Sequence, residues 1–164
     1  MIVVIFLTVD FLRLRIHRIK DIFIVIFGSL LRRREFSGLT GGSYLLLATL
    51  LAAIVFEPRV LIPAVTFLAV GDTLAAIVGL SIGRIRFWNK TLEGTLAGLL
   101  SCVGVAYLAS ILPYWKMPLG VGIMGAFVAA LVEALPIEVN DNVAVPLVSG
   151  LAMQIGLWTH VFGS

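Results

Sequence analysis

Five long stretches with at most one charged side chain each constrain the fold of this 164-residue chain more than any other feature. Each is 21 to 23 residues long, and they are Phe36–Phe56, Val60–Ile82, Gly94–Trp115, Met117–Ile137 and Asn142–Ser164. A helix of about 20 apolar residues crosses the hydrocarbon core of a bilayer. The stretches predict an all-α fold, a polytopic transmembrane helical bundle with about five full spans plus N-terminal membrane segments. We expect one integral membrane domain over residues 1–164.

Composition supports a membrane protein. The chain is 60% apolar and 13% charged, with a mean hydropathy of +1.11, whereas charged residues make up about 25% of ordinary soluble domains. The single cysteine, Cys102, excludes a disulfide within one chain and a cysteine-based zinc site.

The twelve Lys and Arg residues are unevenly placed. Ten of them fall in the segments 13–20, 32–34 and 84–90, while Arg59 and Lys116 lie elsewhere. If the apolar piece 22–31 dips into the bilayer and returns, these ten share one face, which the positive-inside rule assigns to the cytosol. We therefore expect a cell (inner) membrane protein with its site facing the cytosol. Attraction to anionic membrane lipids explains the basic runs, and we expect no nucleic-acid partner.

Three regions place charged residues in or beside apolar stretches, where each charge costs about 2.5–3.5 kcal/mol near the bilayer centre. They are Asp72, next to a stripe of small residues; Lys90 with Glu93, at the predicted start of a helix; and Glu133 with Glu138, Asp141 and Asn142. Carboxylates interleaved with cations suit a nucleotide with Mg²⁺, since oxygens hold the metal and cations hold the phosphates. No GxxxxGK[ST] or HExxH motif is present, which excludes sites built on those motifs.

Each region also has a structural alternative. In the first region, Asp72 would only neutralise its charge against Arg84 or Lys90. In the second, Lys90 and Glu93 would form an ordinary i, i+3 pair. In the third, the Asn140–Asn142 segment would cap the last helix. Small residues at four-residue spacing predict close helix packing. They are Gly71, Ala75, Gly79 and Gly83; Gly94, Gly98, Cys102, Ala106 and Ser110; and Gly122, Ala126, Ala130 and Ala134.

The motifs together resemble the membrane-embedded CTP-dependent lipid kinases, namely phytol kinase, dolichol kinase and the yeast-type diacylglycerol kinase. The likeness covers nearly the whole chain. It rests on Asp10-Phe-Leu-Arg13, Arg34-Glu35, Thr40-Gly41, Gly71-Asp72-Thr73, Gly79, Gly83-Arg84, Lys90-Thr-Leu-Glu93-Gly94, Glu133-Ala-Leu-Pro136 and Asp141-Asn142 with Pro146. The chain departs from the family before Asp10, where a basic Arg-Lys-x-x-His motif is common and nothing here provides it.

The resemblance implies a kinase that uses CTP and Mg²⁺ to phosphorylate a lipid alcohol. Asp72, Glu93 and Asp141 would be catalytic, with Asp72 and Glu93 as metal ligands. Glu133 would contact the substrate, and it or Asp141 would orient or deprotonate the lipid hydroxyl. The expected nucleotide-binding residues are Lys90, Gly79, Gly94, Asn142 and Arg84.

Two other functions stay open on the sequence. A cytidylyltransferase that makes a CDP-lipid shares an aspartate and a Lys-Thr-x-Glu-Gly element with this chain, although its usual Ser-Pro-Lys is Trp88-Asn89-Lys90 here. A small transporter would also carry a mid-helix Asp72, but it would not need Lys90 and Glu93 at a helix start. The lipid alcohol and the oligomeric state are likewise open.

Overall fold

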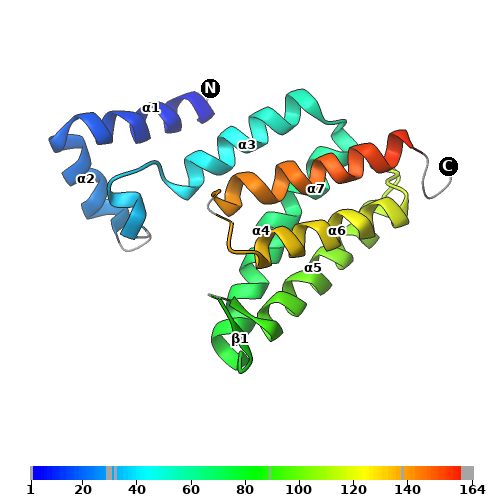
Figure 1. The fold of residues 1–164 in the computed structure, drawn as a ribbon. Coiled ribbons are helices and arrows are strands. Elements are labelled where there is room, and N and C mark those ends of the chain that lie inside the picture. The colour runs from blue at the N-terminus through cyan, green and yellow to red at the C-terminus, as the bar shows by residue number, and fades with distance from the viewer. Residues whose placement is uncertain (1, 29–30, 32, 89, 138, 160–164) are drawn as a thin grey trace. The chain divides into compact units, whose positions relative to one another are not determined.

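The structure is a computed structural model that describes residues 2–28, 31, 33–88, 90–137 and 139–159. Its chain divides into two compact units, Met1–Leu47 and Ala48–Ser164, which we describe separately (Figure 1). The elements in order are α1 (Ile2–Arg15), α2 (His17–Phe27), η2 (Arg33–Phe36), α3 (Gly41–Val55), α4 (Pro58–Ile82), β1 (Arg86–Phe87), β2 (Lys90–Thr91), α5 (Leu92–Ile111), α6 (Leu119–Ala134) and α7 (Asp141–Trp158). The boundary between the units falls inside α3.

The first unit closes around a buried arginine. The Arg13 side chain is fully buried and forms an ion pair with Asp10 on the same face of α1. Its other nitrogens donate to the carbonyl oxygens of Glu35, at 3.0 Å, and Gly38, at 2.8 Å. The guanidinium also lies 4.7 Å from the centre of the Phe23 ring on α2. Arg13 therefore connects α1 to α2 and to the segment that precedes α3.

Asp10 completes this network from the other side. Its carboxylate accepts hydrogen bonds from the Thr40 amide at 2.9 Å, the Thr40 hydroxyl at 3.1 Å, and the Ser43 hydroxyl. Burial alone would raise the pKa of Asp10, but the hydrogen bonds from Ser43, Thr40 and Arg13, with the charge of Arg13, outweigh it and hold the pKa below its usual range. Asp10 and Arg13 thus fix the start of α3 against α1.

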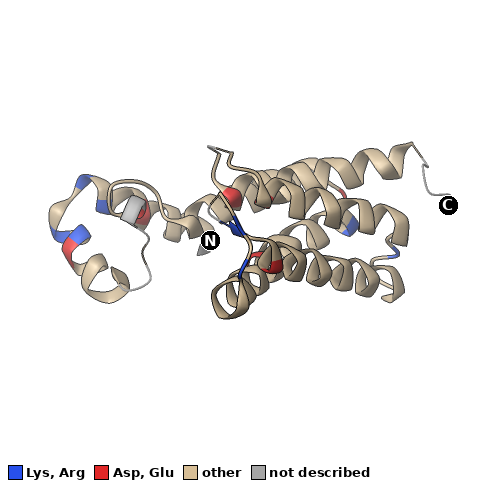
Figure 2. Ribbon diagram, turned by 60° about the horizontal axis from the view of Figure 1, so that its bottom comes forward, with Lys and Arg blue, Asp and Glu red and all other residues tan. Residues whose placement is uncertain are grey.

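Charged residues gather at different places in the two units. Figure 2 shows Lys and Arg around the turn between α1 and α2, and a second group beside acidic residues at the hairpin end of the second unit. Because the units are described separately, the expected shared face of ten basic residues stays a prediction.

Four helices, α4 to α7, form the core of the second unit, which also holds the C-terminal half of α3. α4 packs on α5, α5 on α6, α6 on α7, and α7 also on α4. Small residues make the contacts: a Cβ atom added at Gly71 would lie 2.9 Å from Cys102 Sγ, and one added at Gly122 would lie 3.0 Å from Ala106 Cβ. The predicted close packing through small-residue stripes is confirmed.

A polar cluster joins α4 and α7 at the end opposite the hairpin. The Glu57 amide donates to Gln154 Oε1 at 3.1 Å, and Gln154 Nε2 donates back to Glu57 Oε1 at 3.0 Å. Arg59 Nε donates to Glu57 Oε2 at 2.7 Å. Hydrogen bonds from Gln154 and Arg59 hold the pKa of Glu57 below its usual range. This cluster links residues that are 97 positions apart in the sequence.

The expectation of five full spans is wrong. The fold is all-α apart from the small hairpin, but among the described residues two helices, α4 and α5, are long and apolar enough to cross a membrane. α3 and α6 have 15 and 16 residues, which is about 22–24 Å of helix against about 30 Å of hydrocarbon. α1 and α2 are shorter still, and α7 starts at Asp141 and carries the buried Gln154. The apolar stretches overstate helix length because their ends form turns, as at Leu112–Trp115 and around Pro136.

Candidate functional site

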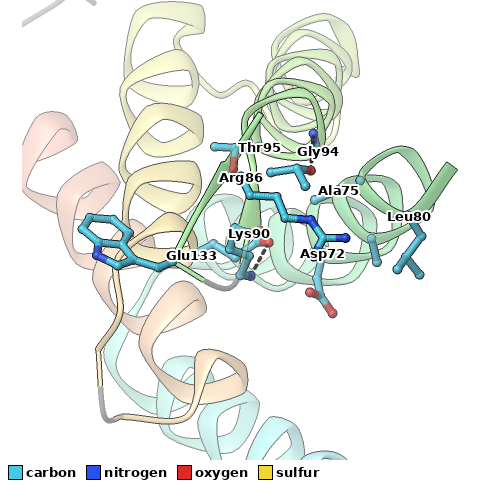
Figure 3. Close-up of a pocket in the computed structure, with 12 residues that line it drawn as sticks. Asp72, Ala75, Leu80, Arg86, Lys90, Gly94, Thr95 and Glu133 are labelled. Atoms are coloured by element: carbon cyan, nitrogen blue, oxygen red, sulfur yellow. Dashed lines mark hydrogen bonds and ion pairs between the residues drawn. The ribbon is translucent and has the colours of Figure 1, made fainter. Parts of the chain in front are cut away.

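A cavity of about 460 Å³ lies in the second unit, where α4 ends and α5 begins. Its size is within the range of small-molecule sites. The lining side chains come from α4, the hairpin, α5 and α6: Asp72, Ala75, Ala76, Gly79, Leu80, Arg86, Trp88, Lys90, Thr91, Gly94, Thr95 and Glu133 (Figure 3). The cavity combines two carboxylates and two cations with an apolar wall.

The β-hairpin carries the two cations. β1 pairs with β2 antiparallel, with Arg86 opposite Thr91 and Phe87 opposite Lys90. Figure 3 shows Arg86 extending from the hairpin toward α4, the helix that carries Asp72. At the base of the hairpin, the Leu92 amide donates to the Ile85 carbonyl at 2.9 Å.

Glu93 and Thr91 stabilise this corner. Both carboxylate oxygens of Glu93 accept from the Ile85 amide, at 3.2 and 3.3 Å. Thr91 caps α5, because its hydroxyl oxygen accepts from the Gly94 amide at 3.2 Å. The predicted metal ligand Glu93 therefore holds the hairpin, and it is not among the residues that line the cavity.

Lys90 forms the centre of the charged cluster. Its Nζ lies 3.0 Å from Glu133 Oε1 on α6 and 3.9 Å from Asp141 Oδ2 at the start of α7. Burial raises the pKa of Glu133, the Lys90 hydrogen bond and charge oppose that rise, and the neighbouring Asp72 and Asp141 carboxylates add to it. Glu133 thus keeps a proton more readily than an exposed glutamate.

Two predicted nucleotide-binding glycines let α4 and α5 meet below the cavity. A Cβ atom at Gly79 would lie 2.7 Å from Thr91 Oγ1, and one at Gly94 would lie 2.6 Å from the Ala75 carbonyl oxygen. Both glycines line the cavity. Any larger residue would push the helices apart and deform the wall.

The structure brings together part of the predicted site. Asp72, Lys90, Glu133, Gly79 and Gly94 line the cavity, and Asp141 lies next to Lys90. Arg84 and Asn142 are not lining residues. The Asn142 amide instead donates to Asn140 Oδ1 at 3.0 Å, so Asn140 caps α7 as the structural alternative expected. Glu138 lies outside the described residues.

Sequence analysis missed Arg86 and Trp88 as lining residues. Arg86 lies on β1 and Trp88 follows it in the connection to β2, so both reach the cavity through the hairpin that pairs Phe87 with Lys90. Strands of two residues are too short to give an alternating pattern in the sequence, so no clear signal marked this hairpin.

The cavity residues suit a Mg²⁺ ion that arrives with phosphates better than a resident metal. Within the described ranges, no three His, Cys, Asp or Glu side chains form a group that would hold a metal. Mg²⁺ commonly takes one or two carboxylates, and substrate phosphates and water complete its shell. Asp72 and Glu133 supply two carboxylates to the same cavity.

The comparisons with known proteins leave the function to be argued from this geometry. No protein-family model and no solved structure matches the chain. The chain is similar to a protein of Rickettsia prowazekii (strain Madrid E) named "Uncharacterized protein RP860". The two are 26% identical over 146 residues, which cover 86% of this chain and 72% of the relative.

Proposed function

We propose that this chain is an integral membrane kinase that transfers the terminal phosphoryl group of CTP to the hydroxyl of a lipid alcohol such as phytol, a polyprenol or diacylglycerol. One observation carries the proposal. Lys90 lies 3.0 Å from Glu133 inside a cavity that Asp72 and Arg86 also line. A cavity with both cations and carboxylates matches what a nucleotide with Mg²⁺ needs.

The cations bind the phosphates in this proposal. Lys90 contributes a compact charge and Arg86 a planar fork that matches phosphate oxygens. Lys90 is 30% exposed, so a phosphate reaches it without unfolding the site. Arg86 replaces Arg84, which the sequence had suggested, because Arg86 lines the cavity.

The apolar surface supports a membrane location. α4 and α5 expose large aliphatic side chains, with Leu80 90% and Leu100 71% exposed. Large apolar side chains exposed along both helices favour contact with lipid or with another protein. We propose that α4 and α5 cross the cell (inner) membrane with the hairpin on the cytosolic side, where CTP is present. Leu80 lines the cavity as well as facing outward, which offers a lipid tail a lateral way in.

The proposed reaction is a direct transfer. The lipid hydroxyl oxygen forms a bond to the γ-phosphorus, the bond from that phosphorus to the β,γ-bridging oxygen breaks, and the electron pair leaves with CDP. Glu133 accepts the hydroxyl proton, since its raised pKa makes it a better base than an ordinary glutamate. Lys90, which lies between Glu133 and Asp141, orients Glu133. Asp72 would hold the Mg²⁺ that accompanies the nucleotide, which would supply positive charge to neutralise the phosphates.

The test is label transfer by the purified full-length protein in lipid nanodiscs. Each alcohol is incubated with CTP labelled at the α- or the γ-phosphate, and lipid products are separated. We expect γ-label on the lipid, and a loss of at least about a hundredfold for Asp72→Asn. Asp21→Asn, the same change at an exposed site on α2, should keep full activity.

Other results would identify other functions. α-Label on the lipid would mean that the chain is a cytidylyltransferase. No transfer with any alcohol, together with nucleotide-independent flux across proteoliposomes, would identify a transporter. Equal kinase activity in Asp72→Asn and the unaltered protein would remove Asp72 from the site.

A further inference from the structure

Trp88 occupies an unusual position on the rim of the cavity. It follows β1 directly, in the short connection to β2, and its side chain lines the cavity while 64% exposed. The indole contacts Phe87 edge-on, with ring centres 5.6 Å apart. A largely exposed aromatic side chain therefore stands at the rim of the cavity, on the same hairpin as Arg86 and Lys90.

The backbone at Trp88 is strained. Its φ of +48° lies in the left-handed region, which glycine and asparagine adopt far more readily than a bulky aromatic residue. Such residues persist where the surroundings hold them, and they concentrate at functional sites. Here the Phe87–Lys90 pairing and the Glu93 contacts with Ile85 hold the hairpin.

From this position we infer that Trp88 is the platform on which the base of the nucleotide stacks. The inference rests on the proposed function, since it assumes that a nucleotide occupies the cavity. Lys90 and Arg86 bind the phosphates while the indole covers one face of the base, and both contacts come from one hairpin. Stacking of a base on an aromatic side chain tolerates different bases and adds affinity beyond the phosphates.

A membrane-interface role for Trp88 is the competing explanation. Tryptophans at a bilayer surface need an apolar body and a polar tip at headgroup depth, but they need no cavity beside them. Trp158 provides a matched comparison. It is 67% exposed, and it ends α7, about 26 Å along that helix from the Asp141 end that lies near Lys90.

The experiment uses two single-tryptophan forms of the full chain in nanodiscs. One keeps Trp88 and carries Trp115→Phe and Trp158→Phe; the other keeps Trp158 and carries Trp88→Phe and Trp115→Phe. The probes are CTP, inorganic tripolyphosphate and brominated lipid. We expect CTP to quench Trp88 and leave Trp158 unchanged, tripolyphosphate to leave both unchanged, and brominated lipid to quench Trp158 more than Trp88.

Measurements of CTP affinity then distinguish the contribution of the indole ring from that of the backbone conformation at Trp88. Trp88→Asn keeps a residue that tolerates the left-handed conformation but removes the indole, so the hairpin is preserved. We expect its CTP affinity to fall roughly five- to a hundredfold and its tripolyphosphate affinity to stay unchanged, while Trp88→Phe keeps most of the CTP affinity.

Failure of the stacking role and failure of the proposed kinase function give different results. Unchanged CTP affinity in Trp88→Asn would overturn the stacking role and leave the kinase proposal standing. Strong quenching of Trp88 by brominated lipid, with none by CTP, would make it an interface residue. If neither CTP nor tripolyphosphate binds the unaltered protein, the proposed function fails, and the stacking role with it.

Discussion

Two buried carboxylates, Asp10 in the first unit and Glu133 in the second, meet opposite electrostatic surroundings. Asp10 is 1% exposed and accepts hydrogen bonds from an arginine, a backbone amide and two hydroxyls, and its pKa is lowered. Glu133 is 8% exposed, has Lys90 as its cation and two further carboxylates near it, and its pKa is raised. Similar burial therefore produces a fixed charge in one unit and a proton acceptor in the other.

The difference lies in how many polar groups each cluster leaves for a ligand. Arg13 directs its nitrogens at Asp10, Glu35 and Gly38, all within the first unit. Lys90 stays 30% exposed beside a cavity that would hold a small molecule. A closed network stabilises a fold, whereas an open one of the same composition is available for binding.

Arg13→Met should produce the largest effect. It leaves the Asp10 charge and two carbonyl oxygens buried without their donor, and breaking a buried ion pair in this way costs about 3–5 kcal/mol. Hydrogen exchange of the α3 amides near Ser43 should accelerate by more than about a hundredfold. Arg18→Met, the same change at an exposed arginine, should leave exchange unchanged. Equal exchange in the two variants would mean that the network does not stabilise the first unit.

Lys90→Met should affect binding more than folding. Because the cavity is open, water or a proton can stabilise the Glu133 carboxylate after Lys90 is removed. Hydrogen exchange in α6 of Lys90→Met should therefore change much less than exchange in α3 changes in Arg13→Met. CTP affinity should fall at least about tenfold, because a hydrogen bond to a charged group contributes about 1.5–3 kcal/mol. Lys116→Met, at an exposed lysine near the other end of α5, is the control for affinity. A large loss of stability with unchanged affinity would make Lys90 a structural residue like Arg13.

Mild acidification should give the smallest effect, and only the second unit should respond to it. The raised pKa of Glu133 means that its folded form binds a proton more tightly, so stability near α6 rises as the pH falls through that pKa. Asp10, whose pKa is lowered, loses its contribution only below its ordinary value of 3.8. Between that value and neutral pH, exchange in α6 should slow by less than about tenfold while α3 near Ser43 stays unchanged. Glu133→Gln should abolish the pH response of α6; a response that persists would assign it to another group.

The sequence predicted helix packing well and helix length badly. Four-residue spacing of glycine and alanine fixes which faces meet, so the contacts of Gly71 with Cys102 and Gly122 with Ala106 follow from it. Hydropathy does not distinguish an apolar turn from an apolar helix. Leu112, Leu135 and Ile137 extended the predicted spans although they lie beyond the helix ends.

The sequence predicted those site residues that are isolated charges in or beside apolar stretches, and it missed those whose position depends on three-dimensional geometry. Asp72, Lys90 and Glu133 stand out because charged side chains in apolar stretches are costly, and all three line the cavity. Glu93 stands out for the same reason, but its partner is the Ile85 amide, which no composition pattern shows. Arg86 and Trp88 depend on a two-residue strand pairing that the local sequence specifies weakly.

Because the chain is synthesised from its N-terminus, the Asp10 network and the Lys90 cluster can form at different times. All residues of the Asp10 network have been synthesised once Ser43 has been made. The network can therefore form while the rest of the chain is still being synthesised, and it stabilises the N-terminal segment. Lys90 must wait for Glu133, and then for Asp141 at the start of the last helix. Since domains tend to fold as they emerge from the ribosome, a truncated product that ends before α7 would carry a finished first unit and an incomplete charged cluster. Premature release would thus yield a chain with a folded N-terminal unit but without the complete charged cluster, and quality control that senses only the N-terminal unit would fail to detect it.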